Sequence, residues 1–558
     1  MWLIWCLLVL GVEGVAQRGN HPWTIILCKF ADLDEEPKPP DWFKAWLTDD
    51  RVPGSLNKFF TDISNGIYTI KGSNVLGWYR LPWSRAHIVE FAKQDANLRK
   101  LNDAKLKFYY KTKELCLAYA TRLGAQVHDN VINVVNDENT AVFCKESGVL
   151  LTPKFFLTSA LAHEITHSLN IGHSYSDAQI RVFPYAEEGE YDDRYDLMST
   201  ANAYMHKASF GMTGPGLNAP HLDFLGWLPA NRILFFDRKE AIVRLASLSV
   251  PHPESRGYLL LLIPYDRDDA GSAFAVEYRT PHNLDQGIKQ AAVVIHRLER
   301  KADGYRYSYL ITHGRRYYEL ISGTEWEHRL PNSSNGQPRT IRIRFLRSSE
   351  KHSSADVHVL SDFDPLECQE GEQERGISPE DRVCVPTQPT AKTWPSKDAK
   401  GRCPDGLVER GAVGQDRACV SGEEKEASDA ANAAWFRRDA FYKARTATFG
   451  LNACTRPELV WRLIDAHDFA CVSVEQRRSI AQQNTLHVNR SSADGHCLES
   501  FVRRMAFEGD LVCVTPQEAA EVMEENMSQP KLIDYYAFFN GVDDVSLPSI
   551  HQQPRKRT

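Results

Sequence analysis

Beyond residue 17, the chain of 558 residues has no apolar run of the roughly 20 residues that a bilayer-spanning helix requires. It also has no marked excess of either charge, since 66 lysines and arginines stand against 73 aspartates and glutamates, a net charge of −7. A charge of this size favours neither nucleic acid nor an anionic membrane surface as a partner. We therefore expect a soluble mature protein with no membrane span and no nucleic-acid partner.

The first residues, MWLIWCLLVLGVEGVAQ, combine an apolar run from Trp2 to Leu10 with small residues at Gly14 and Ala16. This pattern is typical of a secretory signal peptide cleaved before Gln17, although no lysine or arginine precedes the apolar run. A membrane anchor is the alternative, but the run has only about half the length that a bilayer requires. We expect residues 1–16 to be removed and the protein to be secreted and extracellular.

Cleavage there would leave eleven of the twelve cysteines, and an oxidising compartment favours disulfides among them. Eight belong to four similar segments that begin at Cys368, Cys403, Cys454 and Cys497 and each end in Cys-Val. Each segment is too small to bury a core of its own, which predicts one disulfide within each copy. The pairing of the other three, Cys28, Cys116 and Cys144, stays open.

The order of apolar patterns predicts a multidomain protein. Strand-like runs from Trp23 and Asn130, with a helical pattern over 105–123, predict an α/β domain with a twisted sheet at 17–230. Short β-forming runs separated by turn residues predict an antiparallel β-sandwich at 231–365. Four small disulfide-stapled repeats at 366–530 and a tail at 531–558 complete the predicted organisation.

The segment LTSALAHEITHSLNIGHS carries the residues most suited to chemistry. On a helix, whose start Thr152 and Pro153 would mark, His163 and His167 share one face, with Glu164 beside them. A catalytic zinc ion uses three protein ligands and keeps one position open.

His173 can become the third ligand only if the helix ends near Asn170 and the chain turns back. Asparagine adopts the left-handed conformation needed there better than other non-glycine residues. The spacing therefore predicts a zinc site at His163, His167 and His173, with Glu164 as the general base.

Met198 lies twenty-five residues after His173, within YDDRYDLMST. Together with the histidines, it resembles the Met-turn of metzincin zinc peptidases, although Asn170 stands where their motif has glycine. Further segments resemble gametolysin-like and immune inhibitor A-like secreted metallopeptidases: VPGSLNKFFTDISNGIYTIKGSNVLGWY at 52–79, LNAPHLDFLGWL at 217–228, and SAFAVEYRTPHNLDQGI with VVIHR at 272–297. The resemblance implies Zn²⁺, endopeptidase activity on protein or peptide substrates, and a β-rich domain after the catalytic one.

Two alternatives stay open. A thermolysin-like site would take its third ligand from Glu187, Glu188 or Glu190, although His173 and Met198 favour the metzincin pattern. The alternative from another class is a catalytically silent adhesion protein, built on a protease-like shell, that contacts carbohydrate or a surface through its repeats. The natural substrate, the control of activity and the oligomeric state do not follow from the sequence.

Some metzincins place a metal-assisting tyrosine shortly after the Met-turn, where this chain has Thr200. Tyr195 and Tyr204 lie nearby in the sequence, but spacing selects neither of them. Three further histidines are expected to be structural, because the triad already satisfies an open zinc site: His206, His221 and His296.

Overall fold

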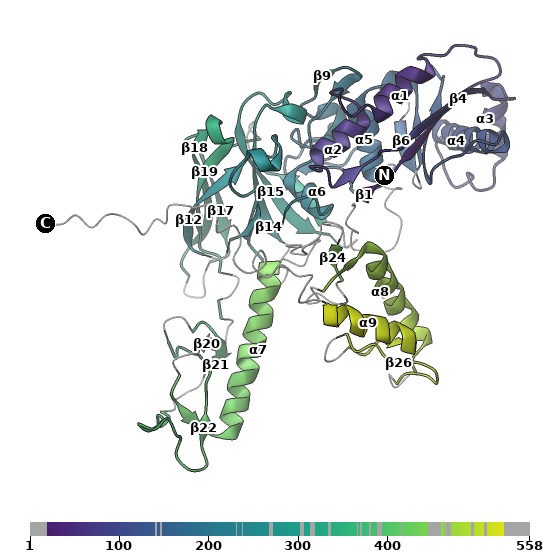
Figure 1. The fold of residues 1–558 in the computed structure, drawn as a ribbon. Helices are drawn as coiled ribbons and strands as arrows, with labels where there is room; N and C mark the ends of the chain where they lie inside the picture. Colours follow the sequence, from purple (N-terminus) through teal and green to yellow (C-terminus); the bar gives the residue numbers. More distant parts are fainter. Residues whose placement is uncertain are drawn as a thin grey trace.

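A computed structural model gives a mixed α/β molecule with several sheets (Figure 1). It describes residues 19–528 except 140–141, 146–147, 230–231, 237, 267–271, 302–305, 313–317, 333–335, 365–366, 369–370, 379–380, 388–392, 414–415, 445–458, 463, 465–469, 493–495 and 507–509. The expected signal peptide and the expected tail lie outside the described residues. Among those described, no helix has the length and apolar character needed to cross a membrane.

The N-terminal region is built on a five-stranded sheet in the order β4-β2-β5-β7-β6. Its strands are β4 (Asn74–Arg80), β2 (Trp23–Lys29), β5 (Asn130–Val135), β7 (Gly148–Leu151) and β6 (Val142–Lys145). The first four run parallel, whereas β6 runs antiparallel to β7 at the edge of the sheet. The strands predicted from Trp23 and Asn130 are confirmed, and the apolar run of β2 fits a strand with both faces covered.

Helices cover both faces of this sheet. Successive residues of β2 point to opposite faces, so Ile25 and Leu27 join one core while Ile26 and Cys28 join the other. The first core includes residues of three helices: α1 (Pro40–Thr48), α2 (Leu56–Ile63) and α5 (Thr158–His167). The second lies under α3 (Arg85–Gln94) and the predicted helix α4 (Ala104–Arg122).

Cys28 and Cys116 form a disulfide across the second core. It joins the central strand β2 to α4 across 88 residues of sequence, with the two Cα atoms 6.1 Å apart. This distance lies within the usual range for a disulfide. The pairing that spacing left open is therefore Cys28 with Cys116.

Two sheets packed face to face follow, of six and four strands. The six-stranded sheet has β11 (Ile233–Phe235), β13 (Leu260–Pro264), β14 (Ala273–Arg279), β15 (Ala292–Arg300), β16 (Arg306–Leu310) and β8 (Tyr175–Ser176), in that order. The four-stranded sheet has β12 (Glu240–Ala246), β19 (Ser354–Ser361), β18 (Arg339–Ser349) and β17 (Glu325–Leu330).

The larger sheet of the sandwich is mixed rather than purely antiparallel as predicted. β11 runs parallel to β13, and β8 runs parallel to β16. β8 belongs to the segment directly after His173, so the N-terminal region contributes an edge strand to the sandwich. Pairing between segments so distant in sequence leaves no local pattern, which explains why the sequence did not reveal it.

Each cysteine repeat folds as a small hairpin, and helices follow three of them. The hairpins pair β20 (Glu372–Glu374) with β21 (Cys384–Pro386), β22 (Val408–Glu409) with β23 (Cys419–Val420), β24 (Leu459–Trp461) with β25 (Cys471–Ser473), and β26 (Val502–Arg503) with β27 (Cys513–Val514). The helices are α7 (Gly422–Ala444), α8 (Val474–Leu486) and α9 (Pro516–Ser528). In Figure 1, the first two hairpins lie along α7, and α8 and α9 form a separate group.

The predicted disulfides within the repeats are confirmed for the three copies in which both cysteines are described. They join Cys368 to Cys384, Cys403 to Cys419 and Cys497 to Cys513. The recurring arginine and aspartate of the repeats form ion pairs: Arg375 with Asp381, Arg410 with Asp416, and Arg504 with Asp510. Each unit is thus held by one covalent link and one ion pair in place of a large core.

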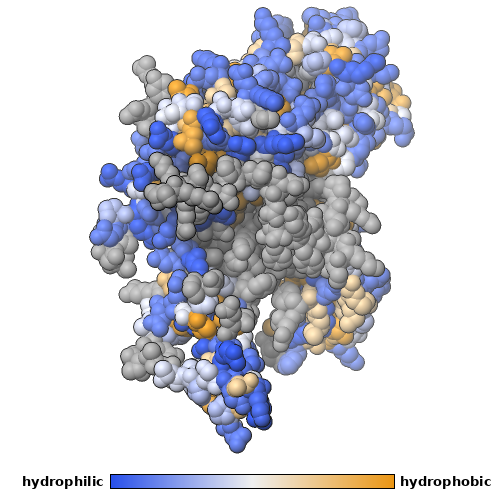
Figure 2. Space-filling view, turned by 60° about the vertical axis from the view of Figure 1, so that its left-hand side comes forward, coloured by the Kyte–Doolittle hydropathy of each residue, from blue (hydrophilic) through white to orange (hydrophobic). Residues whose placement is uncertain are grey.

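Two further short strand pairs and a short helix complete the described strands and α-helices. They are β1 (Gly19–Asn20) with β3 (Tyr68–Thr69), β9 (His206–Ala208) with β10 (Gly211–Thr213), and α6 (Ala219–Phe224). Figure 2 shows that hydrophobic residues on one face of the molecule lie in small groups among hydrophilic ones. The large apolar side chains therefore pack mainly inside the N-terminal region and the sandwich.

Candidate metal centre

Helix α5 carries two of the three predicted ligands and is buried along its whole length. It begins at Thr158, after Leu157 in an extended conformation, and not at Pro153. Pro153 opens a separate 3-10 turn over Pro153–Phe155, without a side-chain cap from Thr152. The start is fixed by tertiary contacts, because the Thr158 hydroxyl accepts a hydrogen bond from the indole of Trp46, 112 residues away.

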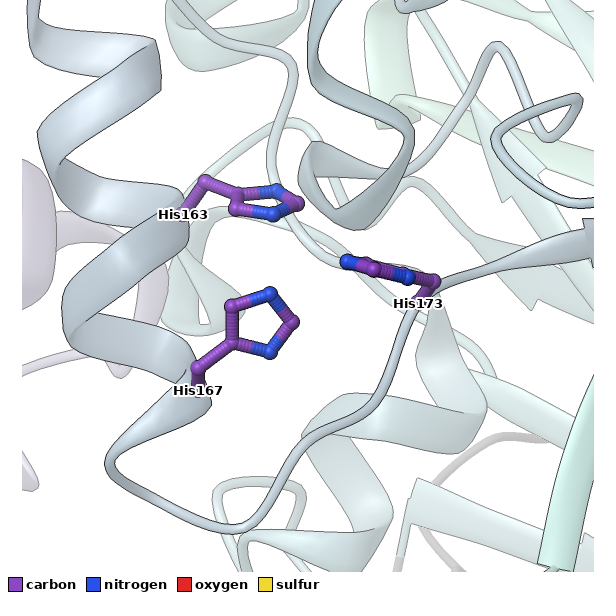
Figure 3. Close-up of side chains that lie close together, drawn as sticks. All are labelled: His163, His167 and His173. Carbon is purple, nitrogen blue, oxygen red and sulfur yellow. The ribbon is translucent and has the colours of Figure 1, made fainter. Parts of the chain in front are cut away.

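Three imidazoles converge at the end of this helix (Figure 3). The ring centroids of His163 and His167 lie 4.5 Å apart. The ring centroid of His173 lies 5.5 Å from that of His163 and 4.8 Å from that of His167. One nitrogen from each ring lies within 4.8 Å of the other two. All three side chains are buried, so the cluster is an enclosed site and not a patch of surface histidines.

The chain reverses after α5 in the way that the third ligand requires. Asn170 has a φ of +64°, the left-handed conformation predicted for it. Its backbone N–H bonds to the carbonyl of His167, which closes the turn. The following residues then carry His173 back to the face of the helix that holds His163 and His167 (Figure 3).

The Nδ1 atom of each imidazole has an oxygen partner. These are the Leu197 carbonyl for His163 at 3.2 Å, the Ile171 carbonyl for His167 at 2.8 Å, and Oε1 of Glu190 for His173 at 2.7 Å. A carbonyl oxygen only accepts, so Nδ1 carries the proton in the first two rings and Nε2 keeps its lone pair. An Nδ1–H bonded to an oxygen is the usual support for a histidine that binds metal through Nε2.

Burial keeps the helical imidazoles neutral. Loss of solvent and the neighbouring His173 lower the pKa of His163 to about 3. Loss of solvent, together with His163 and His173, holds the pKa of His167 well below its ordinary value. A neutral imidazole is the form that binds a metal ion, so both rings are ready to act as ligands at neutral pH.

The donor set fits a metal ion. Nε2 of His167 is buried and has no hydrogen-bond partner, a costly state for a polar atom unless a ligand completes it. Within the described part of the chain, these three histidines are the group of ligating side chains that lie close enough to share an ion. Three imidazole nitrogens suit zinc and leave its fourth position open.

Two other predicted residues lie at this cluster. Glu164 follows His163 on α5 and is 5% exposed. Met198 is fully buried, and its carbonyl oxygen lies 3.5 Å from the backbone nitrogen of Ser174, next to His173. The carbonyl of the preceding residue, Leu197, accepts the hydrogen bond from His163. The turn around Met198 therefore helps to fix the orientation of the His163 ring.

The three glutamates of the thermolysin-like alternative do not lie where a third metal ligand would be needed. Glu190 binds Nδ1 of His173, on the far side of the ring from Nε2, and therefore orients the histidine. Glu187 and Glu188 have exposed side chains. Within the described residues, none of the three belongs to the group that could share an ion.

Sequence reasoning missed Tyr191. Its hydroxyl lies 3.0 Å from Nε2 of His173, and the two rings lie 4.2 Å apart. Its φ of +63° is unusual for an aromatic residue and places the side chain toward the triad. Burial raises the pKa of the phenol well above its ordinary value, and the carboxylates of Glu190 and Glu164 raise it further, so the hydroxyl stays protonated.

Tyr195 and Tyr204, the candidates that spacing did not separate, lie elsewhere. Their rings contact each other at 5.3 Å, and they pack in a small buried cluster with residues of β15 and β16. Nothing in the sequence signals that Tyr191, seven residues before Met198, adopts a positive φ. Only the fold could single out Tyr191.

Two of the three histidines expected to be structural, His221 and His296, are bound to buried carboxylates. Nδ1 of His221 lies 2.7 Å from Asp196, and Nε2 of His296 lies 2.9 Å from Asp193. Asp196 also accepts the backbone N–H of Met198, which links these pairs to the turn under the triad.

A buried arginine extends this support into the sandwich. Arg279 on β14 forms two hydrogen bonds to Asp285, of 2.9 and 2.6 Å, and one of 2.9 Å to Glu277. Asp285 accepts the backbone N–H of Gly216, whose carbonyl accepts the N–H of Leu197. A continuous series of bonds thus runs from the sandwich to the carbonyl that holds His163.

No family model matches the chain, and no curated protein matches its sequence. Among solved structures, the chain is similar to two crystal forms of wild type OgpA from Akkermansia muciniphila, with 13% and 14% sequence identity. The matches cover 64% of this chain and 97% and 96% of those chains, with a TM-score of 0.24 in both. A TM-score this low carries no argument, so the functional conclusion rests on the geometry of the site alone.

Proposed function

We propose that the protein is a secreted zinc-dependent endopeptidase of the metzincin type. The observation that carries the proposal is the convergence of three buried imidazoles, two of them on the helix that also carries the buried Glu164. His163, His167 and His173 would hold the ion, and Glu164 would act as the base. The turn around Met198 and the left-handed Asn170 agree with this assignment.

The sheet next to the site supports a polypeptide substrate. Strand β6 is the antiparallel edge of the five-stranded sheet and lies against α5. The free edge of a strand can pair with an extended peptide through main-chain hydrogen bonds. A substrate bound along β6 would therefore pass close to the triad.

The mechanism assigns a task to each residue around the cluster. When bound, zinc supplies a Lewis acid that activates water and polarises the scissile carbonyl. Glu164 accepts the proton of the attacking water and passes it to the leaving amine. With Nε2 of His173 bound to the ion, the Tyr191 hydroxyl that lies 3.0 Å from that nitrogen would be released to donate a hydrogen bond to the oxyanion that develops on the carbonyl, and Glu190 would keep His173 oriented.

Metal analysis combined with a cleavage assay tests the proposal. The purified protein is expected to hold about one zinc ion per chain and to hydrolyse unfolded casein, and a chelator should abolish both. His167→Ala should bind zinc at least about 100-fold more weakly, because it removes a direct ligand. A protein that binds no zinc, or that cleaves equally well without it, would contradict the proposal.

Tyr191→Phe is expected to lower kcat by about 10²-fold with no loss of bound zinc, since one donor to the oxyanion is removed. The ring that packs on His173 stays in place, so the fold should not change. Tyr195→Phe is the matched control, because this buried tyrosine packs outside the triad and should leave kcat within a few-fold of the wild type. Equal kcat values in the two variants would exclude the role proposed for Tyr191.

A further inference from the structure

Residues 177–189 form a loop whose two ends lie close to His173. Its two ends pair at the base: the backbone N–H of Ser176 donates to Gly189, at 2.9 Å, and that of Tyr191 donates to Ser174, also at 2.9 Å. Gly189 has a φ of +77°, and a Cβ there would lie 2.2 Å from the carbonyl oxygen of Ser176. Only glycine allows this close approach, so the base of the loop over 177–189 is held rigidly beside His173.

Aromatic rings connect this loop to the triad. The Tyr191 ring packs on His173, and Phe183 meets Tyr191 edge-on, with ring centroids 5.3 Å apart. Tyr185 then stacks on Phe183 at 5.3 Å, with only 5° between the ring planes. The aromatic contacts therefore form a continuous series from the third ligand to the tip of the loop.

The tip exposes apolar side chains to solvent. Tyr185 is 56% exposed and Ile180 is 45% exposed, and Tyr185 is the most exposed aromatic ring among the described residues. Arg181 is also exposed, but its guanidinium binds the Ala186 carbonyl at 3.0 Å and lies 3.8 Å from Glu188. An exposed apolar group on a rigid loop beside a catalytic cluster is the usual character of a binding subsite.

We propose that Ile180, Phe183 and Tyr185 form a substrate subsite for an apolar side chain of the polypeptide, aromatic or branched aliphatic. The inference rests on the proposed peptidase function and names the residue class that the enzyme prefers near the scissile bond. The ring contacts from His173 through Tyr191 and Phe183 to Tyr185 span a distance that a few residues of extended peptide cover, at about 3.4 Å per residue. The tip of the loop therefore lies within a few residues of the cleaved bond. The subsite lies on the loop over 177–189 and is separate from edge strand β6, where we propose main-chain pairing with the peptide.

The composition of the tip favours an apolar side chain over a sugar. A sugar subsite pairs a stacking ring with several polar groups aimed at the hydroxyls. Here the tip sequence IRVFPY is apolar at every position except Arg181, whose guanidinium contacts groups within the loop, and the exposed Glu187 and Glu188 lie nearer its base in the sequence. The occupant that fits this surface is therefore a peptide side chain that buries its own apolar area on the ring of Tyr185.

The first experiment is a cleavage profile of a mixed peptide library by the wild-type enzyme, Tyr185→Ala and Tyr185→Phe. The wild type should prefer aromatic or branched residues at one position near the cleaved bond. Tyr185→Ala should lower kcat/KM for those peptides about 10-fold or more and leave peptides with a small residue there unchanged. Tyr185→Phe should keep the preference, because the stacked ring remains. Leu123→Ala, an equally exposed apolar residue beyond α4, is the matched control and should change nothing.

A second measurement does not depend on turnover. In the Glu164→Gln background, the best uncleaved peptide should bind with a Kd that Tyr185→Ala raises by a similar factor. An unchanged cleavage profile and Kd in Tyr185→Ala would overturn the subsite. So would a preference for a glycosylated peptide that depends on Tyr185, since this would assign the ring to a sugar. Absence of cleavage by the wild type would instead count against the peptidase function itself.

Discussion

Replacing Glu164 with glutamine is expected to lower kcat for peptide hydrolysis by about 10³-fold or more while the protein keeps its zinc. Glutamine has nearly the same shape but cannot accept the proton of the attacking water. The buried position of Glu164 beside His163 leaves no bulk water to take over this task. Because the side chain is not a proposed ligand, metal content and thermal stability should remain close to those of the wild type.

Zinc analysis and steady-state kinetics on the same preparations check this result. Glu188→Gln is the matched control, since this carboxylate lies on the loop near the site but has an exposed side chain. It should keep kcat within a few-fold of the wild-type value. If Glu164→Gln cleaved casein at the wild-type rate with its zinc in place, the general base would have to be another group.

Replacing Arg279 with alanine is expected to lower the free energy of unfolding by about 3–5 kcal/mol. The guanidinium is 1% exposed and pairs with Glu277 and Asp285, which are 0% and 3% exposed. Without it, two carboxylates would remain buried and uncompensated, a far larger cost than the loss of the pair itself. The damage should extend to the metal centre, because Asp285 binds Gly216 and Gly216 binds Leu197.

Denaturant unfolding and zinc titration of the same variant measure these two effects. Arg244→Ala is the control, since Arg244 is 30% exposed and its partner Asp356 keeps a second ion pair with Arg347. That change should cost about 1 kcal/mol or less. A similar loss in both variants would show that the buried network of Arg279 gives no special support to the fold or the triad.

Much of the fold followed from local patterns. Strands β2 and β5, helix α4 and the stapled hairpins of the repeats all lie where periodicity and cysteine spacing predicted them. The mixed pairing of the larger sandwich sheet did not follow, because β8 pairs with a strand about 130 residues later. Hydrophobic periodicity shows that a strand exists but does not show which distant strand becomes its neighbour.

The convergence of the three histidines was determined by sequence alone to an unusual degree. Two histidines four residues apart on a helix must share a face, and Asn170 could adopt the left-handed conformation that brings His173 back. These constraints act over eleven residues of chain, a range in which backbone geometry leaves few choices.

Tertiary structure alone decided what surrounds that cluster. Glu190 meets His173, Tyr191 turns its hydroxyl toward Nε2, and Arg279 of the sandwich supports the turn under the site. Each of these contacts depends on how a loop closes or on how two regions pack. Such geometry arises from many weak interactions between distant residues, so short-range spacing brought the three histidines together and long-range packing determined their environment.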